Sequence, residues 1–101
     1  MIAEFSVLPL GVGESLAKYV ARALEIVDKS GLPYKFTPMG TIVEGEWNEV
    51  LELIRRCHQA VGEVAPRVIT RIVIDDRRGR TGLIESKVRS VEREVGRELK
   101  K

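Results

Sequence analysis

A chain of 101 residues with a net charge of +2, 44% hydrophobic and 32% charged residues has the size and composition of one small globular domain. Its mixed charges lack the basic footprint of a typical nucleic-acid-binding protein, and no apolar run reaches the roughly 18 residues that cross a bilayer. The single cysteine, Cys57, excludes an internal disulfide, and the N-terminus lacks the residue order of a signal peptide, so we expect a soluble cytoplasmic protein.

The first third of the chain predicts a strand followed by a helix. Ile2–Leu10 is short and apolar, which is typical of a β-strand. After a glycine-containing turn, apolar residues recur at the spacing of one helix face, and Gly31 with Pro33 indicates the helix end. The apolar stripe of this helix consists of Leu16, Tyr19, Val20, Ala23, Leu24 and Val27.

The rest of the chain predicts a hairpin, a helix, a strand and a final helix. Tyr34–Thr37 and Thr41–Glu44 are short strands on either side of a turn that contains Pro and Gly. Arg67–Asp75 is a strongly β-branched strand, and residues 83–99 repeat apolar residues at helical spacing. The second helix is marked by Trp47, Val50, Leu51, Ile54, Cys57, His58 and Val61, and the third by Ile84, Val88, Val91, Val95 and Leu99.

This order predicts an α+β protein, a ferredoxin-like β-α-β-β-α-β sandwich with an added C-terminal helix, in which residues 1–101 form a single domain. The two crossover helices then lie on one face of a four-stranded antiparallel sheet. Neither side of the first or the last strand is plainly polar, and the chain has no further element to cover the second face. We therefore expect that face, and the narrow stripe of the helix at 83–99, to pack against another subunit.

Two short motifs are better explained by structure than by chemistry. Gly11–Leu16 lies between a strand and a helix but has only two of the three glycines of a dinucleotide-binding loop, which favours a plain turn. Cys57 and His58 are adjacent, and a metal site within one chain would need carboxylates as its other ligands. Neighbours on a helix also point about 100° apart, so these two do not form a catalytic pair. We expect neither a metal nor a cofactor.

The charge run Asp75–Arg80 follows directly from a strand. A solvated loop is the favoured interpretation of such a run. The alternative places Asp75 and Asp76 against a ligand at the sheet edge, with Arg77 holding these carboxylates through a bidentate pair.

The stretch TPMGTIVEGEW, Thr37–Trp47, contains a carboxylate in a costly position. Glu44 ends an apolar strand, where it must be exposed at an edge or paired with a cationic group. Glu46 has a sufficient role at the positive N-terminal end of the second helix, and Trp47 is expected to be the first core residue of that helix. Glu44 is therefore the candidate ligand-binding acid.

The blocks SVLPLGVGESLAKYVARAL, SGLPYKFTPMGTIVEGEWNEV and RVITRIVIDDRRG together resemble the small ferredoxin-like thiamine-binding proteins. The resemblance runs over essentially Ile2 to Gly79. It implies a homotetramer, built as a dimer of dimers through the sheet faces, that binds thiamine or its hydroxymethylpyrimidine part without catalysis. Family members often carry several Ser or Thr residues after PLG, where this chain has Gly13-Glu14-Ser15, so the resemblance assigns no ligand contact to this loop.

The resemblance also implies which residues contact the ligand. Thiamine offers a carboxylate the ring nitrogen and exocyclic amine of its aminopyrimidine, and its cationic thiazolium is attracted to aromatic faces. With Glu44 as the paired acid, Glu44→Gln is expected to weaken binding roughly 10- to 150-fold, while Glu46→Gln leaves the affinity almost unchanged. The implied ligand-binding residues are Glu44, Ser6, Tyr34, Thr37, Met39, Trp47 and Asp75, with Phe36 as a further apolar wall.

Other functions occur on the same fold. The alternative to ligand binding is an RNA-binding or protein-interaction ferredoxin-like module. RNA binding requires aromatic residues presented by the central strands, and only Phe5 and Phe36 are available. An acylphosphatase-like enzyme would need an arginine in the loop after the first strand, and Gly11–Ser15 has none. We therefore expect a binding protein that is not an enzyme.

Overall fold

The computed structural model describes all 101 residues and contains four strands and three helices in the predicted order. This order is that of a ferredoxin-like fold with an added helix, which confirms the predicted fold class. None of the helices has the length and apolar character of a membrane-spanning segment. The elements are β1 (Ile2–Leu10), α1 (Ala17–Lys29), β2 (Tyr34–Thr37), β3 (Gly40–Glu44), α2 (Trp47–Gly62), β4 (Arg67–Asp75) and α3 (Leu83–Val95).

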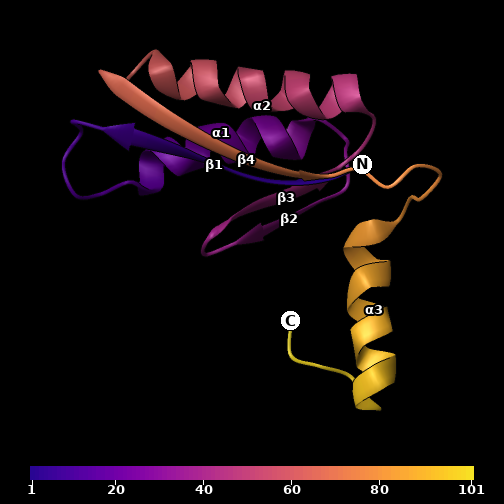
Figure 1. The fold of residues 1–101 in the computed structure, drawn as a ribbon. Helices are drawn as coiled ribbons and strands as arrows, with labels where there is room; N and C mark the ends of the chain where they lie inside the picture. Colours follow the sequence, from indigo (N-terminus) through magenta and orange to yellow (C-terminus); the bar gives the residue numbers. More distant parts are fainter.

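The four strands form one antiparallel sheet in the order β2-β3-β1-β4. The central strand β1 starts with Ile2 paired to Glu44 on one side and to Asp75 on the other. Helices α1 and α2 lie side by side on one face of the sheet (Figure 1). Helix α3 starts near the end of the sheet that holds the N-terminus and extends away from the two-helix layer (Figure 1).

The hydrophobic core lies between the sheet and the two-helix layer. Val27 of α1, Val43 of β3 and Val50 of α2 have no exposed surface. Burying a side chain of this size contributes about 1.5–3 kcal/mol to stability, so the apolar faces of α1 and α2 fix these helices on the sheet. The other members of the core are Ala3, Phe5, Tyr19, Ala23, Leu53, Ile54, Cys57 and Val61.

The second face of the sheet, which we call the open face, is not covered by α1 or α2, and only the first two turns of α3 contact it, at Glu44 and Asp75. Because Ala3 and Phe5 of β1 are buried under α1 and α2, the alternating residues Glu4 and Ser6 point to the opposite side. Cross-strand partners share a face, so Arg71 of β4 lies beside Ser6. The open face mixes apolar and polar side chains, as the sequence predicts. Its members are Ile2, Glu4, Ser6, Leu8, Lys35, Ile42, Glu44, Ile69, Arg71, Val73 and Asp75.

Helix α3 ends earlier than predicted. It stops at Val95, not at Leu99, because Gly96 has a left-handed backbone conformation (φ 87°) that ends a helix. The main-chain N–H of Gly96 donates to the carbonyl of Glu92 and closes the last turn.

Trp47 is not a core residue, contrary to the prediction. Its side chain is 51% exposed and lies beside Leu51 and Arg55 on the outer side of α2. The space inside the start of α2 is taken by Leu32, which packs near Gly45 and Val50. A helix face predicted from spacing alone therefore fails at the first residue of α2, because Leu32 fills the space next to Val50.

Candidate functional site

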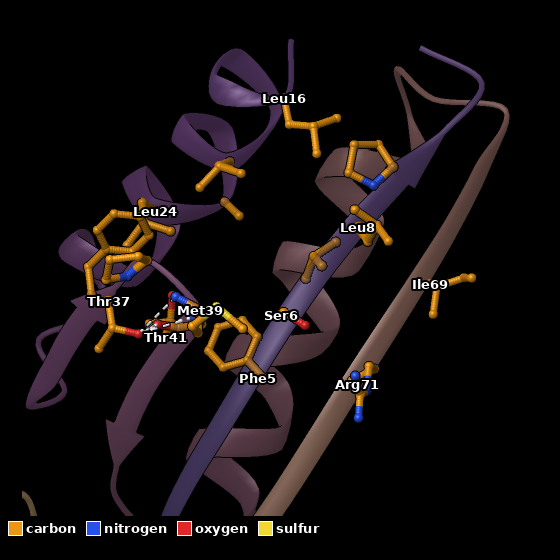
Figure 2. A pocket seen from close by; sticks show the side chains of 17 residues that line it. Phe5, Ser6, Leu8, Leu16, Leu24, Thr37, Met39, Thr41, Ile69 and Arg71 are labelled. Carbon is orange, nitrogen blue, oxygen red and sulfur yellow. Dashed lines mark hydrogen bonds between the residues drawn. The ribbon is translucent and has the colours of Figure 1, made fainter. Parts of the chain in front are cut away.

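A pocket results from the difference in length between β1 and β3. β1 has nine residues and β3 has five. Pairing between them ends at Phe5 and Thr41, so the stretch from Ser6 to Leu10 pairs only with β4. A cavity of about 370 Å³ lies along this stretch, next to the tip of the β2–β3 hairpin (Figure 2). We call it the hairpin pocket.

The walls of the hairpin pocket are mostly apolar. Leu16 and Leu24 face it from the region of α1, and Met39 faces it from the hairpin turn (Figure 2). Volume and lining are in the range of small-molecule binding sites. The pocket is lined by Phe5, Ser6, Val7, Leu8, Pro9, Leu16, Val20, Ala23, Leu24, Phe36, Thr37, Pro38, Met39, Gly40, Thr41, Ile69 and Arg71.

Thr37 fixes the tip of the hairpin. Its Oγ1 donates to the carbonyl of Gly40 at 2.8 Å and accepts from the main-chain N–H groups of Met39 and Gly40 at 3.2 Å each (Figure 2). The closed turn leaves the Met39 side chain 86% exposed at the edge of the pocket, where a flexible thioether can adapt to a ligand. A Cβ at position 40 would lie 3.2 Å from the Phe5 carbonyl oxygen, which explains the glycine there.

The main chain of β1 presents Val7 to the hairpin pocket. The Phe5 carbonyl approaches Gly40 of β3. Main-chain groups alternate in direction along a strand, so the main-chain groups of Val7 and Pro9 point to the same side as those of Phe5. No residue of β3 lies opposite them there, because β3 does not extend beyond Gly40. Proline has no N–H and is suited to such an unpaired edge position. Val7 therefore has one main-chain donor and one acceptor available to a ligand.

Arg71 is the one ionisable residue that lines the hairpin pocket. It is paired in register with Ser6, and both side chains belong to the open face. The Arg71 side chain is exposed and takes part in none of the ion pairs of the protein. The pocket thus combines one guanidinium with hydroxyl groups and contains no carboxylate.

Glu44, the acid predicted to bind the ligand, lies at the other end of β3 and is 7% exposed. Its carboxylate accepts hydrogen bonds from the main-chain N–H groups of Leu83 at 2.9 Å and Ile84 at 3.2 Å. It therefore occupies the N-terminus of α3, where the helix dipole favours a negative charge. Tyr34 lines the same hollow, and its hydroxyl donates to Asp28 at 2.7 Å. This hydrogen bond is the main reason that the pKa of Tyr34 is raised.

Asp75 is paired with Lys87 of α3, and the alternative interpretation, in which Arg77 holds this carboxylate, is wrong for Asp75. The hydrogen bond from Lys87 is the main cause that lowers the pKa of Asp75, and the more distant charge of Arg77 adds to it. Asp75 thus helps to attach α3 to the end of β4.

The hairpin pocket brings together three of the predicted ligand-binding residues, Ser6, Thr37 and Met39. Glu44 and Tyr34 share the hollow beside α3, whereas Asp75 and Trp47 line neither. Two groups in the pocket were missed, the guanidinium of Arg71 and the main chain of Val7. The sequence feature that could have indicated Arg71 is the presence of a charged residue inside the β-branched run VITRIV.

Cys57 and His58 have separate structural partners. The Cys57 thiol is fully buried, donates to the Ala23 carbonyl at 3.5 Å, and has its pKa raised to about 11 by burial. His58 Nδ1 is hydrogen-bonded to Thr70 Oγ1 at 2.6 Å. The structure contains no group of three or more His, Cys, Asp or Glu side chains placed to hold a metal ion.

Phe5, one of the two aromatic residues that RNA binding would require, is 3% exposed and cannot stack on an RNA base.

Comparison of the sequence with models of known protein families shows to which family the chain belongs. A family model described as thiamine-binding protein matches residues 3–92. The chain belongs to the thiamine-binding protein family. The resemblance carried by the three sequence blocks is thereby confirmed.

Relatives of this thiamine-binding family member match it over nearly its whole length. A UPF0045 protein of Mycobacterium bovis is 43% identical over 94 residues, 92% of each chain. A UPF0045 protein of Methanocaldococcus jannaschii is 35% identical over 91 residues, 90% of this chain and 91% of the relative.

Solved structures have the same fold as this family member. A hypothetical protein from Methanocaldococcus jannaschii matches with a TM-score of 0.83 and 36% identity, over 89% of this chain and 93% of that chain. A Thermotoga maritima protein, whose provisional name refers to thiamine biosynthesis or salvage, matches with a TM-score of 0.79 and 27% identity, over 89% and 96%.

Proposed function

We propose that this protein binds thiamine or its hydroxymethylpyrimidine part in the hairpin pocket and catalyses no reaction. The observation that carries the proposal is the pocket beside the unpaired stretch of β1, in a chain that matches the thiamine-binding family over residues 3–92. Its apolar walls suit a flat heteroaromatic ring, and its polar groups are few, as in most small-molecule sites.

The main chain of Val7 complements the edge of an aminopyrimidine. In the proposed complex the Val7 N–H donates to a ring nitrogen, and the exocyclic amine donates to the Val7 carbonyl. Each such hydrogen bond contributes about 0.5–1.5 kcal/mol net. Phe36, which is 54% exposed, and Met39 cover the ring from the hairpin.

A role without catalysis is supported by the chemistry of the candidate nucleophile. The thiolate is the reactive form of cysteine, and the raised pKa of Cys57 keeps the buried thiol protonated at neutral pH. The single histidine of the chain, His58, is hydrogen-bonded to Thr70 of β4. The proposed function therefore needs neither a metal nor a cofactor.

The proposed functional unit is a homotetramer in the cytoplasm, a dimer of dimers. The open face exposes Ile69 by 39% and Val73 by 64%, and α3 exposes Val91 by 53% and Val95 by 48%. Covering these side chains with a second copy removes apolar surface from water. The free thiol of Cys57 fits a reducing compartment.

Two measurements test the ligand. Mass spectrometry of small molecules that remain bound through native purification should detect thiamine or its pyrimidine part. Calorimetric titration should then show that Phe36→Ala weakens binding at least tenfold, about 1.4 kcal/mol. Val64→Ala is the matched control, because Val64 is a 46% exposed apolar residue that lines none of the pockets described above. Unchanged affinity in Phe36→Ala, or failure of the parent to bind any of these compounds, contradicts the proposal.

A further inference from the structure

Arg71 gives the hairpin pocket a positive charge, which is not complementary to the positive charge of thiamine. Arg71 is the one charged side chain in the lining, and no carboxylate is present there to balance it. Thiamine carries a permanent positive charge on its thiazolium ring, so a guanidinium in the pocket repels that part of the molecule. A ligand with an anionic group is attracted at the same position.

Within one protomer, the surroundings of Arg71 leave its guanidinium free to bind an anion. Other arginines of the chain are paired with glutamates, Arg22 with Glu63 and Arg55 with Glu52, whereas Arg71 is not. Glu4, the acid of β1 on the same face, extends its side chain towards Gly40 of β3, on the other side of β1 from Arg71.

The chemistry of the neighbouring groups favours a phosphate. The forked guanidinium matches two phosphate oxygens, and such charge-assisted pairs are stronger than neutral hydrogen bonds. Ser6, opposite Arg71 in register, supplies a hydroxyl donor at the same edge of the pocket. The apolar walls and the main chain of Val7 remain available to the ring.

We propose that Arg71 makes the hairpin pocket selective for the phosphate monoester of a pyrimidine alcohol over the free alcohol and over cationic thiamine. This inference rests on the proposed function, since it assumes that the pyrimidine ring occupies this pocket. Arg71 and Ser6 bind the phosphate, while Val7 and the hairpin bind the ring.

The test is calorimetric titration of the full-length protein at fixed ionic strength with four compounds. These are hydroxymethylpyrimidine, its monophosphate, thiamine and inorganic phosphate. The monophosphate should bind at least tenfold more tightly than the free alcohol, and this advantage should decrease as salt is added. Arg71→Gln should remove the advantage, and Arg71→Lys should keep part of it, because a lysine retains the charge without the fork. Arg67→Gln is the matched control, since Arg67 belongs to the same strand and does not line the pocket.

The outcomes separate this inference from the proposed function. If the pyrimidines bind but the monophosphate has no advantage, or if Arg71→Gln retains it, the role of Arg71 is refuted and the proposed function stands. If inorganic phosphate binds as tightly as the monoester, the pocket does not select the pyrimidine and the inference fails. If Arg71→Gln lowers the mass measured by light scattering and leaves the preference intact, Arg71 belongs to a subunit interface and the inference also fails. Absence of any pyrimidine binding refutes the proposed function itself.

Discussion

The Glu44 carboxylate accepts a hydrogen bond from the main-chain N–H of Leu83, 39 residues further along the chain. A second bond, from Ile84, completes the contact. The residue before α3 is Gly82, which has no side chain to cap the helix, so an acid from a distant strand takes this role. Helix α3 is thereby fixed at its first turn, where Leu83 is also 1% exposed.

Glu44→Gln tests whether this acid serves the helix or the ligand. The substitution removes the negative charge from the N-terminus of α3 and should cost about 0.5–2 kcal/mol, the range measured for lost helix caps and dipole contacts. Hydrogen exchange should show faster opening of the first turn of α3. Affinity for the pyrimidine ligand should change less than threefold, because both carboxylate oxygens already have main-chain partners.

Glu46→Gln is the control for Glu44→Gln. Glu46 is exposed at the start of α2, and its main-chain N–H donates to Glu49 at 3.1 Å. We expect a cost of a few tenths of a kcal/mol at most, with α3 unaffected. A tenfold or larger loss of affinity in Glu44→Gln, with α3 still protected, would restore the direct ligand role predicted from the sequence.

Replacing the exposed stripe of α3 tests the proposed assembly. Val91→Lys combined with Val95→Lys places two charges where apolar contact with another copy is expected, and should lower the oligomeric mass seen by light scattering. Removal of residues 83–101 should dissociate or aggregate the protein. Arg93→Ala, a change on the same helix but outside this stripe, should leave the mass unchanged. A parent protein that stays at 11.3 kDa in dilute solution would exclude the tetramer.

Asp75 should make stability depend on pH in the acid range. Its pKa is lowered in the folded protein, chiefly by the hydrogen bond from Lys87. The contribution of this pair is therefore present above the ordinary pKa of an aspartate and is lost as the pH falls through the lowered value. Thermal melting should show Asp75→Asn less stable than the parent at neutral pH, with the difference disappearing at acid pH and decreasing in high salt. At neutral pH, Asp76→Asn is the matched control for the loss of an aspartate, because Lys87 is paired with Asp75.

Cys57 should be unreactive in the folded protein. Burial raises the pKa of its thiol from 9.0 to about 11, so a thiol reagent at pH 8.5 should label it only after denaturation. The unfolded chain ionises at lower pH than the folded one, so this residue should lower stability as the pH rises from about 9 to 11. The pH profiles of the parent and Cys57→Ala should diverge in that window. Rapid labelling of the native protein would contradict the buried position.

Local pattern was sufficient for the order of the elements and for most of the core, although not for Trp47 or for the end of α3. The apolar residues of α1 recur every three or four positions, and Tyr19, Ala23 and Val27 are indeed buried. The β-branched run Arg67–Asp75 forms β4 with the predicted bounds. These features follow from helix and strand periods, which residues a few positions apart already express.

The partners of charged residues were decided by tertiary structure. Glu44 looked unpaired because its donors, Leu83 and Ile84, come from another element, and Asp75 is paired with Lys87, not with its sequence neighbour Arg77. The hairpin pocket exists because β3 begins only at Gly40, while its antiparallel neighbour β1 continues beyond that point to Leu10, a consequence of the register between the strands. Periodicity determines which face a residue occupies, but only the packed sheet determines what lies opposite that face, since such contacts join residues far apart in the chain.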